Sequence, residues 1–217
     1  MFQDELTQGD TFLTDEPTSE RLRDKVTLRT IAAKLARLRE HGWQKYKQNF
    51  GVERHCFEMN LPIPASDLEE FESHHKVVLP PGYREFLLEI GNGGAGPYWG
   101  LLSLEFWHRI ACDLPEQLPA DYLARSCPLR PGIFAEDWLQ ELGCSWEERY
   151  QGSIALCHQG DGYYGILVVS GDYRGRIFYI DMDGGSPYCL RDTDFLSWYD
   201  RWLDESLSGK PIKAFGY

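Results

Sequence analysis

The chain has 217 residues and a net charge of −12, and 42% of its residues are hydrophobic, with seven Trp, twelve Tyr and eleven Phe. This composition is typical of a folded globular protein with one sizeable core. So acidic a chain repels phosphate backbones, which argues against nucleic acid as a partner. No run of about 18 apolar residues is present, and the first residues lack the pattern of a signal peptide. We therefore expect a cytoplasmic protein that neither spans nor binds a membrane.

Charge divides the chain into three parts. Residues 1–20 carry six acids and no base, residues 21–47 carry nine bases and two acids, and residues 48–217 carry a net charge of −13. We predict a flexible acidic tail at 1–20, a basic helical extension at 21–47 and one domain at 48–217. The six cysteines are widely spaced without a CxxC pair, so we expect reduced thiols.

The first predicted helix runs from about Glu20 to His41 and ends at Gly42. Its apolar residues repeat on one face, namely Leu28, Ile31, Leu35 and Leu38. The basic residues on its other faces allow two interpretations. They form a solvated surface that leans on the acidic domain, or they bind an acidic partner or nucleic acid.

The next segments are less regular. Residues 43–60 alternate imperfectly and predict one or two strands. Ser66 and Glu69 have the spacing of a capping box, so we predict a helix that begins at Ser66 and ends near Lys76.

Residues 79–104 predict a short helix, a glycine stop and a strand. Tyr83, Phe86, Leu87 and Ile90 form one apolar stripe, and Pro80 and Pro81 suit the first turn. Gly91 lies where a left-handed C-terminal residue is expected, and Asn92, Gly93 and Gly94 suit a tight turn. A strand is predicted from Tyr98 to Leu104.

The C-terminal half predicts a meander. Residues 105–150 give no clear pattern, whereas Ser153–Cys157, Tyr163–Val169 and Arg176–Asp181 read as antiparallel strands joined by glycine turns. The middle strand is apolar on both faces, so we expect it to be central and covered by helices. A last helix, capped by Thr193, reaches about Leu207. The predicted fold class is α+β, with a mostly antiparallel sheet flanked by helices.

The run LPPGYREFLLEIGNGGAGPYWGLLSL at 79–104 resembles the signature of the SUKH superfamily, in the branch related to the fungal cell-wall synthesis regulator. SDLEEFESHH before it, and GILVVSGDYRGRIFYID and DFLSWYDRWLDE after it, resemble the same family in the same order. The resemblance covers roughly residues 50–208, and we assign the chain to the bacterial branch. The residues that carry the structural motif are Leu79, Pro80, Tyr83, Phe86, Leu87, Gly91, Asn92, Gly93 and Gly94.

The resemblance implies a protein-binding role without catalysis. Bacterial members are typically immunity proteins that neutralise toxins, and fungal members are regulatory interaction proteins. No catalytic residues can be carried over. The leading hypothesis is thus an immunity protein with a basic polypeptide toxin as partner, and the alternative is a regulatory interaction module.

The residues themselves offer little for catalysis, cofactors or metals. Gly91–Gly96 matches G-x-G-x-x-G, but the loop closes a helix instead of opening one, so a phosphate would face the negative end of the helix dipole. His55-Cys56 and Cys157-His158 cannot be dyads if each pair lies on a strand, since adjacent side chains point to opposite faces. Cys157 with a distant His remains as a minor enzyme hypothesis. His74-His75 lacks metal-ligand spacing.

Four residues are candidates for partner binding. Asp161 and Tyr163 flank a glycine turn between strands, and such residues are either plain turn residues or exposed contacts. Tyr98 and Trp99 are either core residues or partly exposed aromatic anchors.

Overall fold

The computed structural model describes residues 16–111, 118–133 and 137–216. Its centre is a four-stranded antiparallel sheet in the order β1-β2-β3-β4. The strands are β1 (Ser153–Gly160), β2 (Tyr163–Val168), β3 (Ile177–Asp181) and β4 (Tyr188–Cys189). The α-helices are α1 (Glu16–His41), α2 (Val52–His55), α3 (Ala65–His75), α4 (Pro81–Glu89), α5 (Trp138–Leu142) and α6 (Phe195–Leu207), and η1 (Trp43–Tyr46) and η2 (Leu104–Ala111) are 3₁₀ helices. The fold is α+β, as the sequence predicted.

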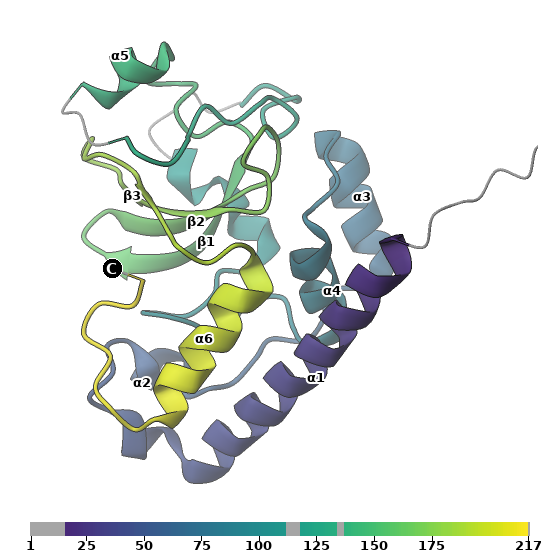
Figure 1. Cartoon of the computed structure of the whole chain (residues 1–217), viewed down its shortest axis with the longest axis vertical. Helices are drawn as coiled ribbons and strands as arrows, with labels where there is room; N and C mark the ends of the chain where they lie inside the picture. Colours follow the sequence, from purple (N-terminus) through teal and green to yellow (C-terminus); the bar gives the residue numbers. More distant parts are fainter. Residues whose placement is uncertain (1–15, 112–117, 134–136, 217) are drawn as a thin grey trace, which may run out of the picture.

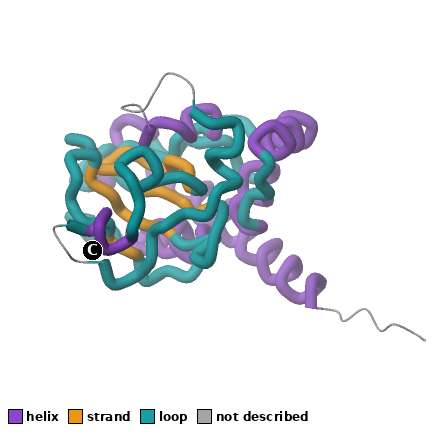
Figure 2. The backbone as a smooth tube through the Cα atoms, turned by 90° about the horizontal axis from the view of Figure 1, so that it is seen from above, coloured by secondary structure: helices purple, strands orange, loops and turns teal. Residues whose placement is uncertain are grey.

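Two hydrophobic clusters cover the two faces of the sheet. Leu167 of β2 belongs to the larger cluster, with residues of α1, α4 and α6, whereas Ile166 and Val168 belong to the smaller one, with Trp138. Figure 1 shows α5 on the opposite side of the sheet from α1, α4 and α6, and Figure 2 shows the strands enclosed among loops. The prediction that this strand is central and apolar on both faces is confirmed.

Helix α1 is built into the core. Its four predicted apolar residues are buried, and the helix packs against α6 and α4. On its flank the ammonium of Lys34 lies 2.8 Å from the carboxylate of Asp200 and 2.7 Å from that of Asp204, both on α6. The basic helix therefore leans on the acidic domain, as the first interpretation held. It begins at Glu16, within the segment predicted as a tail, and residues 1–15 lie outside the described residues.

Two predicted strand segments are different in the structure. Residues 43–60 hold the short helices η1 and α2, and there only Met59 forms a β-bridge, with Gly94. Between Tyr98 and Leu104, Leu101 bridges to Gly94 and Cys157 but no strand forms. Left-handed backbone at Tyr98 (φ 57°) and Gly100 (φ 96°) breaks the extended run before η2 begins.

The predicted helix caps were also wrong. Helix α3 begins at Ala65, after Pro64, and Ser66 lies inside the helix, where its hydroxyl donates to Asp67. Helix α6 is capped by Asp194 instead of Thr193. The Asp194 carboxylate accepts the backbone N–H of Ser197, at 2.8 Å, which satisfies a donor of the first turn.

The motif at 79–94 forms a structural corner. Tyr83, Phe86 and Leu87 are buried in the larger cluster, together with Leu79. Gly91 is not left-handed: a Cβ there would lie 2.5 Å from the carbonyl oxygen of Asn60, so a close approach of backbone requires the glycine.

The loop after the helix is fixed by its own contacts. Gly93 (φ 86°) and Gly94 (φ 109°) do adopt left-handed backbone, and the Asn92 side chain accepts the N–H of Leu104 at 2.7 Å. Pro80, at the start of the corner, is buried.

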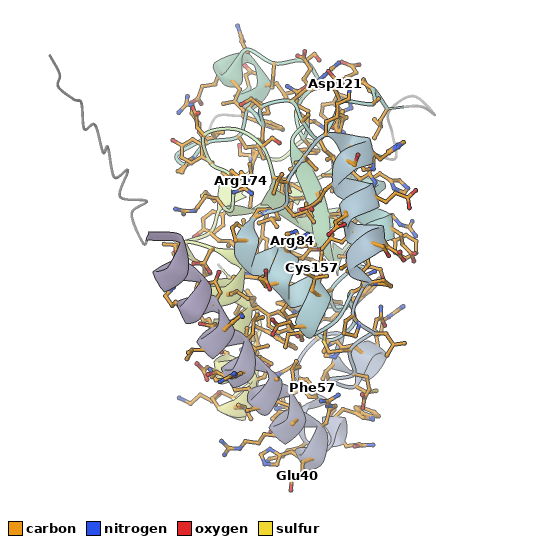
Figure 3. The ribbon with its side chains drawn as sticks, turned by 90° about the vertical axis from the view of Figure 1, so that its right-hand side faces the viewer. Glu40, Phe57, Arg84, Asp121, Cys157 and Arg174 are labelled. Carbon is orange, nitrogen blue, oxygen red and sulfur yellow. The ribbon has the colours of Figure 1, made fainter. Side chains whose placement is uncertain are left out.

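Side-chain contacts link helix α3 to helix α4. The carboxylate of Glu72 on α3 accepts from the Arg84 guanidinium on α4 at 3.1 Å and from the N–H of Leu79 at 2.9 Å. Arg84 is labelled in Figure 3. Within the described ranges, no helix combines the length and the apolar character that a membrane crossing requires.

Candidate protein-binding surface

The cysteine–histidine pairs lack the geometry of a thiol nucleophile and its base. Cys157 is fully buried in the larger cluster, and burial raises the pKa of its thiol to about 12. His158 points to the other face, against Trp99 and Tyr164. His55 and Cys56 lie at the end of α2 instead of on a strand. Among the described residues, no three His, Cys, Asp or Glu side chains group as metal ligands would.

The structure brings the four candidate partner-binding residues to one end of the sheet. Asp161 and Gly162 form the turn between β1 and β2, with Asp161 exposed at φ 44°. Tyr163, the first residue of β2, is 42% exposed. Tyr98 and Trp99 reach the same end because the Trp99 N–H donates to the carbonyl of His158 on β1, at 3.4 Å.

Tyr98 and Tyr163 lie on the face of the larger cluster. Tyr163 alternates along β2 with Leu167 through Gly165, and Tyr98 packs edge-to-face on Tyr179 with ring centroids 6.0 Å apart. The Tyr98 hydroxyl donates to the carbonyl of Phe215 at 2.9 Å. Tyr98 is therefore half-buried by core contacts. A solvent-open hollow of about 270 Å³ lies beside it, and its lining residues are Tyr98, Gln159, Tyr163, Lys213 and Ala214.

Trp99 lies at the centre of an aromatic and cationic surface on the opposite face. Its ring stacks on Phe50 at 5.9 Å and meets His158 edge-to-face at 4.9 Å. The guanidinium of Arg54 lies 4.3 Å from the Trp99 ring, and His158 packs on Tyr164 at 4.7 Å. We call this surface the Trp99 patch; its residues are Phe50, Arg54, Trp99, Arg109, His158 and Tyr164.

Electrostatics tie Arg109 to the patch. Burial lowers the pKa of the His158 imidazole, and the positive charges of Arg109 and Arg54 lower it further, while Asp161 acts in the opposite sense. The lowered pKa favours the neutral imidazole at pH 7. The guanidinium groups of Arg54 and Arg109 thus both act on the His158 imidazole.

Close backbone packing holds the patch rigid. Gly51 has φ 83°, and a Cβ there would lie 2.0 Å from the carbonyl oxygen of Tyr98 and 2.8 Å from the Trp99 ring. This position therefore requires glycine, which lets α2 carry Arg54 up to the indole. The Leu102 N–H donates to the carbonyl of Leu156 on β1 at 2.7 Å, which anchors the other end of the segment.

The comparisons with known proteins give one result. The model of the SMI1/KNR4 family (SUKH-1) matches residues 62–201, about two thirds of the chain. The chain belongs to this family. The SUKH-1 family includes immunity proteins and Smi1/Knr4 and is generally non-catalytic. No curated protein and no solved structure matches the chain.

The sequence did not predict part of the candidate binding surface of this SUKH-1 protein. Phe50 and Arg54 precede the matched residues, and His158 was considered only as a catalytic base. The available signal was Phe50 directly before Gly51 in a polar segment, because glycine favours turns and turns lie at the surface. Phe50 is 53% exposed.

Proposed function

We propose that this SUKH-1 protein is an immunity protein that binds and neutralises a cognate polypeptide toxin in the cytoplasm. The observation that carries the proposal is the rigid Trp99 patch beside the exposed hairpin turn of Asp161 and Tyr163. Aromatic and arginine side chains at the centre of a surface supply most of the affinity of a protein interface. The family includes immunity proteins, which supports this reading.

Net charge supports a basic toxin as the partner. The chain carries −12, and opposite charge on a partner accelerates encounter without fixing the detailed contacts. The four candidates Tyr98, Trp99, Asp161 and Tyr163 are proposed as contacts of that partner. No nucleic acid, cofactor or metal has a role in this proposal.

A growth assay tests the proposal. The gene beside this one is expressed alone and together with the chain, and we expect growth arrest that the chain relieves. Changing Trp99 and Tyr163 to alanine should abolish relief, whereas Val78→Ala should not, because Val78 is 66% exposed and lies outside the surface. The comparison requires that both variants have the melting temperature of the wild type.

Three outcomes would count against an immunity role. They are a neighbouring product without toxicity, toxicity that the chain does not relieve, and relief that survives loss of both aromatic residues. A gene without a toxin neighbour would instead favour a regulatory module of the cell-wall-regulator kind.

A further inference from the structure

The Trp99 patch carries two cations that have no ion-pair partner among the described residues. Arg54 and Arg109 are exposed and form no ion pair with any residue in the described ranges. Arg84 and Arg201, in contrast, are paired with Glu72 and Asp192 at 3.1 and 2.5 Å. In an acidic chain, two guanidinium groups without an ion-pair partner give this surface a local positive charge.

Each of these arginines is held by an aromatic ring. The Arg54 guanidinium lies 4.3 Å from the Trp99 ring, and that of Arg109 lies 5.2 Å from the Phe106 ring. A guanidinium stacked on a ring keeps the N–H groups at its edge available, and these fit both oxygens of a carboxylate.

Two further features favour a bound anion with an apolar neighbour. Helix η2, which carries Arg109, packs on β1, which carries His158, and both arginines act on the His158 imidazole, with Asp161 acting in the opposite sense. Phe50 is 53% exposed and stacks on Trp99, so apolar surface lies beside the charges. The backbone contact between Gly51 and Tyr98 fixes this arrangement before binding, which lowers the entropy lost on binding.

We propose that the Trp99 patch binds an acidic segment of a protein partner, with carboxylates on Arg54 and Arg109 and an adjacent apolar side chain on Phe50 and Trp99. This inference rests on the proposed function and specifies the chemistry of the contact. It is compatible with a partner of positive net charge, because overall charge governs approach whereas local groups govern the docked geometry. Nucleic acid would also meet stacked rings and arginines, but the chain's charge of −12 opposes it.

Short probes test the inference on the full-length chain by nuclear magnetic resonance. The probes are a blocked peptide of glutamates around one leucine, its counterpart with lysines, and a short oligothymidylate. We expect the glutamate peptide to shift the indole N–H signal of Trp99 and the Nε–H signal of Arg54. Reversing both charges with R54E and R109E should weaken this binding about tenfold or more.

The control carries the same change of charge elsewhere. R29E with R37E alters two exposed arginines of α1 and should leave the binding intact. Equal shifts with the lysine peptide, or equal loss in the control, would overturn the acidic preference while leaving the surface as a binding site. No shift at Trp99 with any peptide, or preference for oligothymidylate, would also overturn it. The growth assay tests the immunity role independently of these peptide measurements.

Discussion

At the scale of single residues, His55 couples the stability of the fold to pH. Its side chain is buried, and its Nδ1 accepts the backbone N–H of Phe57 at 3.0 Å. Its ring meets Phe57 and Trp202 edge-to-face. Burial lowers the pKa of the imidazole from 6.5 to about 4, and a hydrogen bond with the Gly96 backbone only partly opposes this.

The shift predicts a loss of stability in mild acid. Between pH 6.5 and 4, His55 binds a proton in the unfolded chain but stays neutral in the folded chain. The free energy of unfolding therefore falls as the pH falls. The loss due to His55 is about 3 kcal/mol over this window. Urea unfolding at several pH values measures it, and His55→Gln should reduce the slope by the contribution of His55. An unchanged slope in the variant would assign the effect to other groups.

Gly93 tests whether the glycine loop is structural. A Cβ at Gly93 (φ 86°) would lie 2.7 Å from the Ser103 nitrogen, whereas at Gly132 (φ 83°) it would meet nothing within 4 Å. Valine is strained at both positions, so the difference isolates the steric clash. Gly93→Val should lower the free energy of unfolding by about 2 kcal/mol more than Gly132→Val does. Correct folding with loss of partner binding alone would contradict a structural role.

At the scale of elements, α1 belongs to the core although the family match begins at residue 62. Ile31 is fully buried, whereas Val26 on the same helix is 58% exposed. Ile31→Ala should cost about 2–5 kcal/mol of unfolding free energy, because it leaves a cavity between α1 and α6. Val26→Ala should change it by less than about 0.5 kcal/mol.

Deletion of residues 1–47 extends this test to the whole helix. It should lower the melting temperature strongly or prevent folding, because it also removes Tyr46 from the core and the Lys34 ion pairs. Unchanged melting of the truncated chain would show that α1 is dispensable.

The sequence predicted elements whose residues agree locally with their structure. β-Branched runs between glycine turns gave the meander, and the aromatic stripe gave α6. The predictions from the sequence were wrong where tertiary contacts determine the backbone conformation. The left-handed backbone of Tyr98 depends on contacts with β1 and Phe215, and no local sequence pattern predicts it. The cap of α6 shifted by one residue because two adjacent polar residues, Thr193 and Asp194, both suit that position.

The candidate surface was predictable only in part, for the same reason. Trp99 and Tyr163 stood out as aromatic residues beside glycine turns. Arg54, Arg109 and His158 join them from α2, η2 and β1, and only the folded chain brings these segments together.

At the scale of the whole molecule, the elements that form the hydrophobic core are distinct from the exposed side chains of the proposed binding surface. The helix α4 and the corner after it pack in the larger hydrophobic cluster, and the sheet lies between the two clusters, while Asp161 and Tyr163 at the hairpin end of the sheet and Arg54 on α2 are exposed. Glu40, near the end of α1, and Asp121 lie at opposite ends of the fold (Figure 3), so the effects of surface substitutions at these two positions should be additive.

Site-specific photo-crosslinking in the native cell tests the central claim, that the hairpin end binds a protein. A photoreactive aromatic residue, which keeps an aromatic ring at the position, replaces Trp99 in one variant and Val78, which is 66% exposed, in a control. Our account predicts a discrete polypeptide adduct from position 99 that is absent from position 78, and loss of the adduct when Arg54 and Tyr163 are also changed to alanine. Equal adducts at both positions, or no polypeptide adduct at position 99, would contradict it.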